Sequence, residues 1–305
     1  MVGGRARGLR MEQARRAAYA VEEITDRASI LRALETRRDY AAYAIGQLDD
    51  RYVDLVRCYQ AKGTTGQAIV LYSSAGLGNA LFAMGDSGAL MAILRLHQGP
   101  RHNYATCQPE HLPVVRRFFT FAQEQTMARM AVTAETFQPL TATPGGTVVR
   151  RLRPGDVRSL NVLYSAEGVP AYYTATHLRE GMYFGVYEHG RLVSVAGTHV
   201  ISEQWSVAVV GNVFTHPLHR GHGYAEVATG AVTAELLHHC RDVVLTVDPE
   251  NTPAVRAYRR LGYREQCRLI EAAVVRRDAF AVGSRIARAV ARYRGRKQGT
   301  ELVLG

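Results

Sequence analysis

The chain has 305 residues, of which 47% are hydrophobic, so it can form a sizeable core and, by length, about two domains. No window of about 18 uninterrupted apolar residues occurs, which excludes a predicted membrane span, and the basic N-terminus lacks the apolar segment of a secretory signal. The four cysteines are far apart and have neither zinc-site nor C-x-x-C spacing. We therefore expect a reduced, cytoplasmic protein.

The formal net charge of +11 is concentrated at the two ends of the chain. Residues 1–38 contribute +4 and residues 276–305 contribute +6, whereas residues 39–275 contribute +1. Such ends could attract nucleic acid, anionic lipid or an acidic partner. Solvated helix faces are the simpler explanation, so nucleic-acid binding is not expected.

Residues 1–140 are predicted to form a helical and mixed α/β domain without a recognisable chemical motif. The expected elements are a helical segment over 11–48, a buried strand over 67–74, a helix over 110–124 and a strand over 127–137. The Pro-, Gly- and Thr-rich segment 138–147 is the best linker in the chain.

The pattern restarts after this linker and predicts a second domain over residues 147–275. Its expected elements are a strand from 147, helices within 156–180, a hairpin over 182–202, a β-rich run over 205–217, an amphipathic helix from 223, a strand over 242–248, a helix over 251–262 and closing strands over 263–275. Residues 276–305 form a basic tail with a further helix over 279–296.

The segment HPLHRGHGYAEV, residues 216–227, joins the β-rich run to the amphipathic helix. Backbone N–H groups at a helix N-terminus lack intrahelical partners and attract phosphate. Gly221 and Gly223 permit positive φ, and Arg220 adds a positive charge. The P-loop needs a Gly-Lys pair, which the chain lacks, and the dinucleotide pattern needs Gly or Ala at position 226, which is Glu.

Three histidines in the same segment, His216, His219 and His222, raise the alternative of a metal site. Pro217 interrupts them, and no acidic or cysteine ligand joins them. We therefore expect no metal.

Residues Arg220 to Ala225 resemble R/Q-x-x-G-x-G/A, the acyl-CoA pyrophosphate loop of the GNAT superfamily of N-acetyltransferases. The preceding GNVFTHP resembles the family's fourth strand, and NTPAVRAYRRLGY, residues 251–263, resembles N-x-x-A-x-x-x-Y-x-x-L-G-F/Y. The resemblance covers roughly 147–275. It implies a mixed, mostly antiparallel sheet flanked by helices, an α/β (α+β) fold. Residues 1–140 show no such motif, and a degenerate copy of the same fold is one interpretation of them.

The resemblance implies direct transfer of an acetyl or other acyl group from acetyl-CoA or another acyl-CoA to a primary amine in a ternary complex. It assigns Tyr258 as the general acid, and Asn251 as either a CoA contact or a helix cap. The remaining cofactor contacts that it implies are Asn212, Val213 and Phe214 for the pantetheine, and Arg220, Gly221, His222, Gly223, Tyr224 and Ala225 for the pyrophosphate.

The general base is less evident, because many relatives use a Glu on the fourth strand and SVAVVGNVF has no acid. His199 on the preceding strand is the nearest titratable candidate and could accept a proton near neutral pH. Glu203, His216 or a chain of waters are alternatives. The segment SAEGVPAYYTATH could recognise the amine through Glu167, Tyr172, Tyr173 and His177, or form a helix–helix contact.

Two other functional classes stay open. The absent strand carboxylate and the Arg-rich ends suggest a non-catalytic acyl-CoA-binding regulator. A nucleic-acid or membrane-surface protein acting through 279–296 ranks lower, because the sequence lacks interleaved aromatic residues for base stacking. Acyl-CoA and an amine are the expected partners, with a homodimer as a further option.

Overall fold

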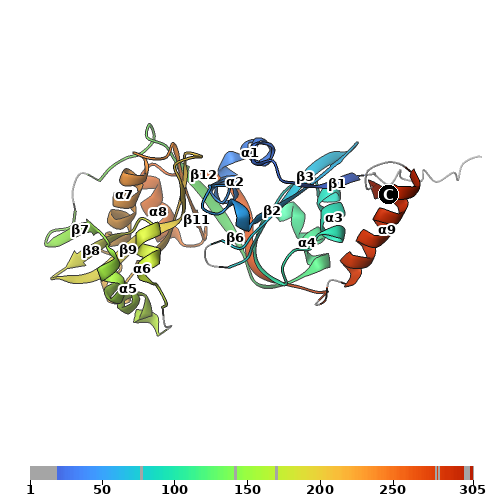
Figure 1. Ribbon diagram of the computed structural model, residues 1–305. Helices are drawn as coiled ribbons and strands as arrows, with labels where there is room; N and C mark the ends of the chain where they lie inside the picture. The colour runs from blue at the N-terminus through green and yellow to red at the C-terminus, as the bar shows by residue number, and fades with distance from the viewer. Residues whose placement is uncertain are drawn as a thin grey trace, which may run out of the picture.

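The computed structural model describes residues 19–75, 78–140, 143–168, 171–278, 280, 282–298 and 303–304. The described strands form one 13-stranded sheet in the order β13-β1-β2-β3-β4-β5-β12-β6-β11-β10-β9-β8-β7. Figure 1 shows the sheet running the length of the molecule, with β6 and β12 in the middle.

The first half of the chain supplies one end of the sheet. Its elements are β1 (Tyr19–Ile24), α1 (Arg27–Glu35), α2 (Arg38–Gly46), β2 (Val56–Gly63), β3 (Gly66–Ser73), β4 (Ala80–Gly85), α3 (Ser87–Leu96), β5 (His102–Cys107), α4 (Leu112–Phe118) and β6 (Phe119–Val132).

The second half repeats this order of strands and longer helices. Its elements are β7 (Thr147–Arg151), α5 (Val157–Tyr164), α6 (Ala175–Glu180), β8 (Phe184–Glu188), β9 (Arg191–Ser202), β10 (Val207–Thr215), α7 (Tyr224–Leu236), β11 (Asp242–Val247), α8 (Thr252–Arg260) and β12 (Arg264–Arg276). The helix α9 (Val282–Gln298) and the short β13 (Val303–Leu304) follow.

The pairing of the strands shows that the two halves share one topology. In each half a single parallel pair, β4 with β5 and β10 with β11, is flanked by antiparallel strands. In each half the helix α3 or α7 connects the parallel strands, as such a crossover requires. This confirms the expected mixed, mostly antiparallel sheet and identifies the first half as a topological copy of the second.

The long strands β6 and β12 join the two halves. β12 belongs to the second half by sequence but pairs with β5 of the first, while β6 of the first half pairs with β11 of the second. The two strands also pair with each other from Arg264 to Arg276. Each half is therefore completed by a strand that the other half supplies.

Helices cover both faces of the sheet, because successive strand residues point to opposite faces. In β2, Cys58 belongs to the core beneath α1 and α2, whereas its neighbour Tyr59 belongs to the core beneath α3. In the second half, Val186 packs with α7 and Val195 with α5 and α6. Four apolar clusters result, and the one beneath α1 and α2 also contains Val200, Val207 and Val209 of the second half.

Three sequence predictions need correction. The predicted helix over 11–48 contains the strand β1, whose Tyr19 and Val21 are buried in alternation; residues 11–18 lie outside the described part. The helix over 110–124 ends at Phe118, where the chain extends into β6 to pair with β12. The helical stretch 156–180 is broken after α5, where Gly168 takes φ 84°.

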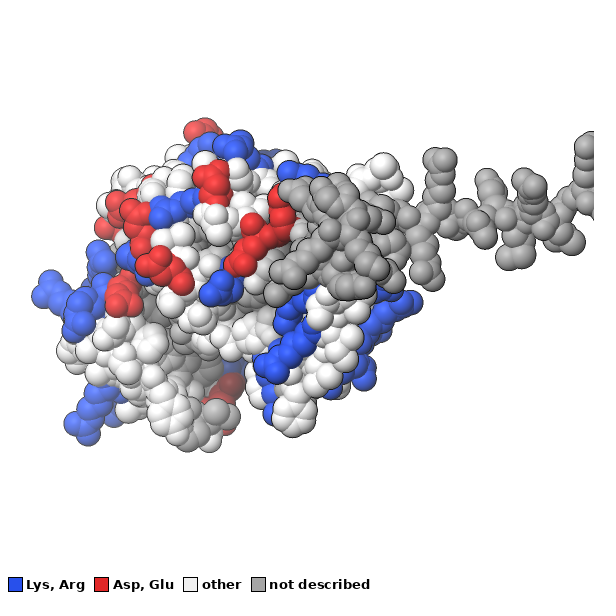
Figure 2. Space-filling view, turned by 45° about the vertical axis from the view of Figure 1, so that its right-hand side comes forward, with Lys and Arg blue, Asp and Glu red and all other residues white. Residues whose placement is uncertain are grey.

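Other predictions are confirmed. The hairpin turn lies between Glu188 and Arg191, and its central residues His189 and Gly190 both have positive φ, as a two-residue hairpin turn requires. The helix predicted over 279–296 is α9. Its apolar Val282 and Ile286 are exposed, beside Lys and Arg side chains at this end of the molecule (Figure 2). None of the described helices has the length and apolar character to cross a membrane.

Candidate functional site

The site begins where β10 and β11 separate. The two strands pair in parallel from Val207 to Val210, opposite Asp242 to Leu245, and the described ladder ends there. The end of β10, residues 211–215, keeps its partner β9 on one side only. A cavity of about 750 Å³ opens beside it, between this strand end, the loop before α7 and the helix α8.

Most of the predicted cofactor residues line this cavity. The predicted residues that the structure brings together here are Val213, Phe214, Arg220, Gly221, Gly223, Tyr224, Ala225, Asn251 and Tyr258. Two predicted contacts do not line it: the side chain of Asn212 faces another cavity, and His222 turns back on the loop. The His222 ring stacks on Tyr224 with 5.6 Å between centroids.

The loop before α7 has the backbone that an anion site needs. Gly221 has φ 82° and Gly223 has φ 78°, and a Cβ at either position would meet no atom within 4 Å. Glycine is therefore favoured at these positions because of the positive φ, and not because a side chain would lack space. Because α7 starts at Tyr224, the N–H groups of its first turn lie at the cavity.

A carboxylate that the sequence did not single out anchors this loop. Glu188, at the end of β8, accepts a hydrogen bond from the Tyr224 hydroxyl at 2.5 Å and contacts His219 Nδ1 at 2.7 Å. The Tyr224 hydrogen bond lowers the pKa of Glu188. Glu188 closes the hairpin turn, so its position next to the loop depends on tertiary packing that no local pattern indicates.

Arg220 has partners within the chain. Its guanidinium pairs with Glu167 at 2.5 Å and lies 5.9 Å from the Phe214 ring centroid. Glu167, one of the residues considered for amine recognition, therefore lies beside Arg220 and does not line the smaller cavity. Tyr172, another of them, is 83% exposed and lines neither cavity of the site.

The start of α8 supplies a cap and a cation. The Asn251 side chain accepts a hydrogen bond from the N–H of Ala254 at 3.3 Å, so it caps the helix while lining the cavity. Arg256, which sequence analysis missed, lines the same cavity and is exposed, without an ion pair among the described residues. The Arg260 side chain donates hydrogen bonds of 2.9 and 3.0 Å to the carboxylate of Glu226 in α7.

Tyr258 is a buried tyrosine that lines the larger cavity. Its side chain is 7% exposed, and no described residue forms a hydrogen bond with its hydroxyl. Burial raises the pKa of Tyr258 to about 12, because the charged phenolate is poorly solvated there. The group therefore keeps its proton at neutral pH and can donate it to an atom in the cavity.

Two β-bulges shape the other side of the strand end. On β10, Asn212 and Val213 lie between the pairs Gly211↔Gly197 and Phe214↔Val195, and Asn212 takes φ 53°. On β9, His199 is the extra residue beside Val210↔Thr198. Bulges redirect side chains. Here they border a second cavity of about 240 Å³, which contains Asn212 and His199.

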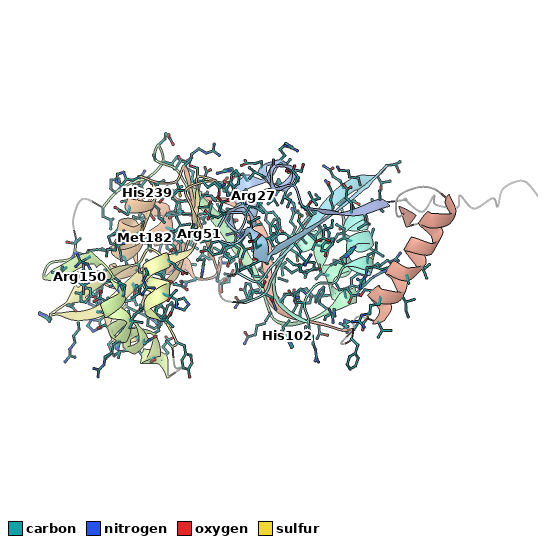
Figure 3. All side chains as sticks on the ribbon, in the orientation of Figure 1. Arg27, Arg51, His102, Arg150, Met182 and His239 are labelled. Carbon is teal, nitrogen blue, oxygen red and sulfur yellow. The ribbon has the colours of Figure 1, made fainter. Side chains whose placement is uncertain are left out.

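Both halves of the chain line this second cavity. Tyr43 and Tyr52 come from the first half; the contributing side chains of the second half include Tyr173, His177, Glu180, Tyr183 and Ile201. Figure 3 marks Arg51 where the two halves meet, and this residue donates a hydrogen bond to the carbonyl of Ile201. Of the four predicted recognition residues, the structure thus places Tyr173 and His177 here.

The His199 ring lies over the backbone of β10. A Cβ at Gly211 would lie 2.0 Å from His199 Nε2. The imidazole therefore occupies space that the side chain of any other residue at position 211 would fill. The ring is accessible from the cavity, yet desolvation by the surrounding protein, together with the charge of Arg129, lowers the pKa of His199. The neutral imidazole, which can accept a proton, therefore predominates at neutral pH.

The alternative bases lie outside this cavity. Glu203 contacts His239 Nδ1 at 3.6 Å. His216 caps a short helical turn through its Nδ1, and its ring lies 5.4 Å from that of His219. The described residues contain no group of three or more potential ligands that could hold a metal ion.

The equivalent position in the first half lacks the glycine loop. β4 ends at Gly85 and α3 starts at Ser87, so one residue, Asp86, replaces the eight between Thr215 and Tyr224. The Asp86 carboxylate accepts hydrogen bonds from the N–H of Ala89 and the hydroxyl of Tyr19, both at 2.9 Å. An anionic side chain thus fills the helix N-terminus of the copy.

Residues 150–263 match the family model "Acetyltransferase (GNAT) family". No curated protein matches the chain. Two similar solved structures are GCN5-related N-acetyltransferases. The one from Sphaerobacter thermophilus has 15% identity and a TM-score of 0.55, covering 85% of this chain and 95% of its own. The one from Kribbella flavida has 18% identity and a TM-score of 0.54, covering 80% and 96%.

A Drosophila protein of 12% identity reaches a TM-score of 0.60, covering 83% of this chain and 98% of its own. At these identities the solved structures show a shared fold. The family match and the glycine loop at the separated strands agree: residues 150–263 of this chain are similar to the GNAT acetyltransferases.

Proposed function

We propose that the protein is an N-acyltransferase that moves an acetyl or other acyl group from acyl-CoA to a primary amine. The observation that carries this proposal is the pair of cavities on either side of one bulged strand end. The larger has a helix N-terminus and a protonated tyrosine, and the smaller has a neutral imidazole.

The larger cavity suits the acyl-CoA. The N–H groups of residues 221–225 would bind the pyrophosphate, with Arg220 and the unpaired Arg256 as nearby cations. The unpaired edge of residues 211–215 would pair with the pantetheine amides. An N–H group at this edge can also stabilise the charge that develops on the thioester oxygen.

Transfer then requires two proton movements. The amine nitrogen attacks the thioester carbonyl, forming a C–N bond as the C–S bond breaks. His199 would accept the proton that the amine loses, since its pKa is lowered. Tyr258 would donate a proton to the departing thiolate, since its pKa is about 12. The amide product and free CoA then leave, and release of the proton from His199 to solvent with uptake of one proton by the Tyr258 phenolate restores both groups.

Acetyl-CoA binding tests the first step. Acetyl-CoA at a hundredfold excess over its Kd should raise the free energy of unfolding by about 2.7 kcal/mol, measured as a shift in Tm. A protein that shows no shift with any acyl-CoA is not an acyltransferase. Binding without transfer to any amine would instead support the non-catalytic regulator.

A further inference from the structure

The smaller cavity is an aromatic enclosure. Its tyrosines are Tyr43 and Tyr52 from the first half and Tyr173 and Tyr183 from the second. The Tyr173 ring meets Tyr183 edge-on at 6.1 Å and His177 at 5.6 Å, while Tyr43 lies 6.5 Å from His199. Aromatic rings attract cations at their faces. The enclosure therefore suits an organic ammonium better than an anion.

The charged residues that line the smaller cavity also favour a positively charged ligand. Glu180 is its only carboxylate, and no Arg or Lys is among the described lining residues. Glu180 is exposed and forms no ion pair with a described residue. Arg51 interacts with Glu180 electrostatically but forms its ion pair with Asp49 at 2.7 Å and a hydrogen bond with the carbonyl of Ile201. Glu180 is therefore available to a cation from outside the chain.

We propose that the acceptor is a small primary amine without an acidic group. Its ammonium would enter past Glu180 and the tyrosines and release one proton to solvent; the neutral amine would then lose its second proton to His199 as it attacks the thioester. This inference rests on the proposed acyl transfer. A carboxylate on the acceptor would face Glu180 without a counter-charge, so amino acids are poor substrates. Tyr43 and Tyr52 make the first half a determinant of acceptor specificity, although it lacks the glycine loop.

Tyramine and L-tyrosine form a matched pair of probes, because they differ only in the carboxylate. We expect kcat/KM for tyramine to exceed that for tyrosine by about tenfold or more, a difference of about 1.4 kcal/mol. Glu180→Gln should lower kcat/KM for tyramine about tenfold and so reduce the ratio of kcat/KM for tyramine to that for tyrosine. Tyr52→Leu should raise the KM for tyramine while leaving the Kd for acetyl-CoA unchanged. Tyr104→Phe, at an exposed tyrosine of the first half outside the cavity, is the control.

The outcomes separate this inference from the function on which it rests. Equal or faster turnover of tyrosine overturns it, as does an unchanged ratio in Glu180→Gln. So does acetyl-CoA binding without tyramine binding, measured by calorimetry on the CoA-loaded protein. If acetyl-CoA fails to bind, the proposed function falls, and tyramine titrated into the cofactor-free protein still decides whether the cavity takes an amine.

Discussion

At the scale of residues, the site consists of two titratable side chains whose surroundings move their pKa values in useful directions. Burial raises the pKa of Tyr258, and desolvation together with the charge of Arg129 lowers the pKa of His199. An acid that stays protonated and a base that stays neutral at the same pH are what amide formation from a thioester needs. The three histidines of the glycine loop contact the loop itself, Glu188 and Tyr224, and the alternative base His216 lies outside the smaller cavity.

Replacement of Tyr258 by Phe removes the proposed acid while keeping the ring. We expect kcat to fall by about 10²-fold or more, within the range for general acid catalysis. The Kd for acetyl-CoA should stay within about twofold, because no hydrogen bond to a described residue is lost. Stopped-flow turnover with calorimetric binding measures both, and an unchanged kcat excludes Tyr258 as the acid.

The pH dependence reports on His199. Its folded pKa lies below the ordinary 6.5, so the active neutral form predominates above that pKa and is lost as pH falls through it. The rate should therefore decline on the acid side with an apparent pKa below 6.5, and Tyr258 should not limit it up to about pH 9. A profile of kcat/KM tests this. His199→Gln should abolish the acid limb, and its persistence would assign that limb to another group.

At the scale of elements, the bulges and the divergence of β10 from β11 position these groups. The sequence predicted the glycine loop, α7 and α8, because each has a local pattern of capping residues, glycines or apolar spacing. It did not predict that His199 is a bulge residue or that β1 is a strand. Bulges and short strands depend on pairing with distant segments, such as β10 for His199 and β2 for β1.

A substitution at Gly211 tests whether the bulge is needed to place the His199 ring in the cavity. A methyl group there would collide with the imidazole, so Gly211→Ala should displace the ring from the cavity and lower kcat about tenfold or more. Gly155→Ala is the control, because its Cβ would meet no atom within 4 Å. Turnover and far-UV circular dichroism are the measurements; a fully active, folded Gly211→Ala protein would show that the ring position does not matter.

At the scale of the whole molecule, the two halves share a topology but differ at the turn before the crossover helix, where the second half has the glycine loop and the first has Asp86. The sequence allowed a degenerate copy as an interpretation of the first half, yet the exchange of β6 and β12 could not be predicted, since it pairs segments more than a domain apart. Nor could the sequence place Tyr43 and Tyr52 beside His199. In the first half the Asp86 carboxylate takes the position that a phosphate would need.

This asymmetry predicts the binding stoichiometry. One acetyl-CoA should bind per chain, because the helix α3 already has its N-terminus capped by an anion. Isothermal titration calorimetry gives the number directly. Two equivalent sites per chain would mean that the first half also binds the cofactor.

Hydrogen–deuterium exchange with and without acetyl-CoA tests whether the strand end and the glycine loop bind the cofactor, because it reports on the backbone amides themselves. We expect acetyl-CoA to slow amide exchange over residues 211–215 and 221–225. Exchange over residues 85–89, at the equivalent turn of the first half, should not change. Protection at 85–89, or bound acetyl-CoA without protection at 221–225, would contradict this expectation.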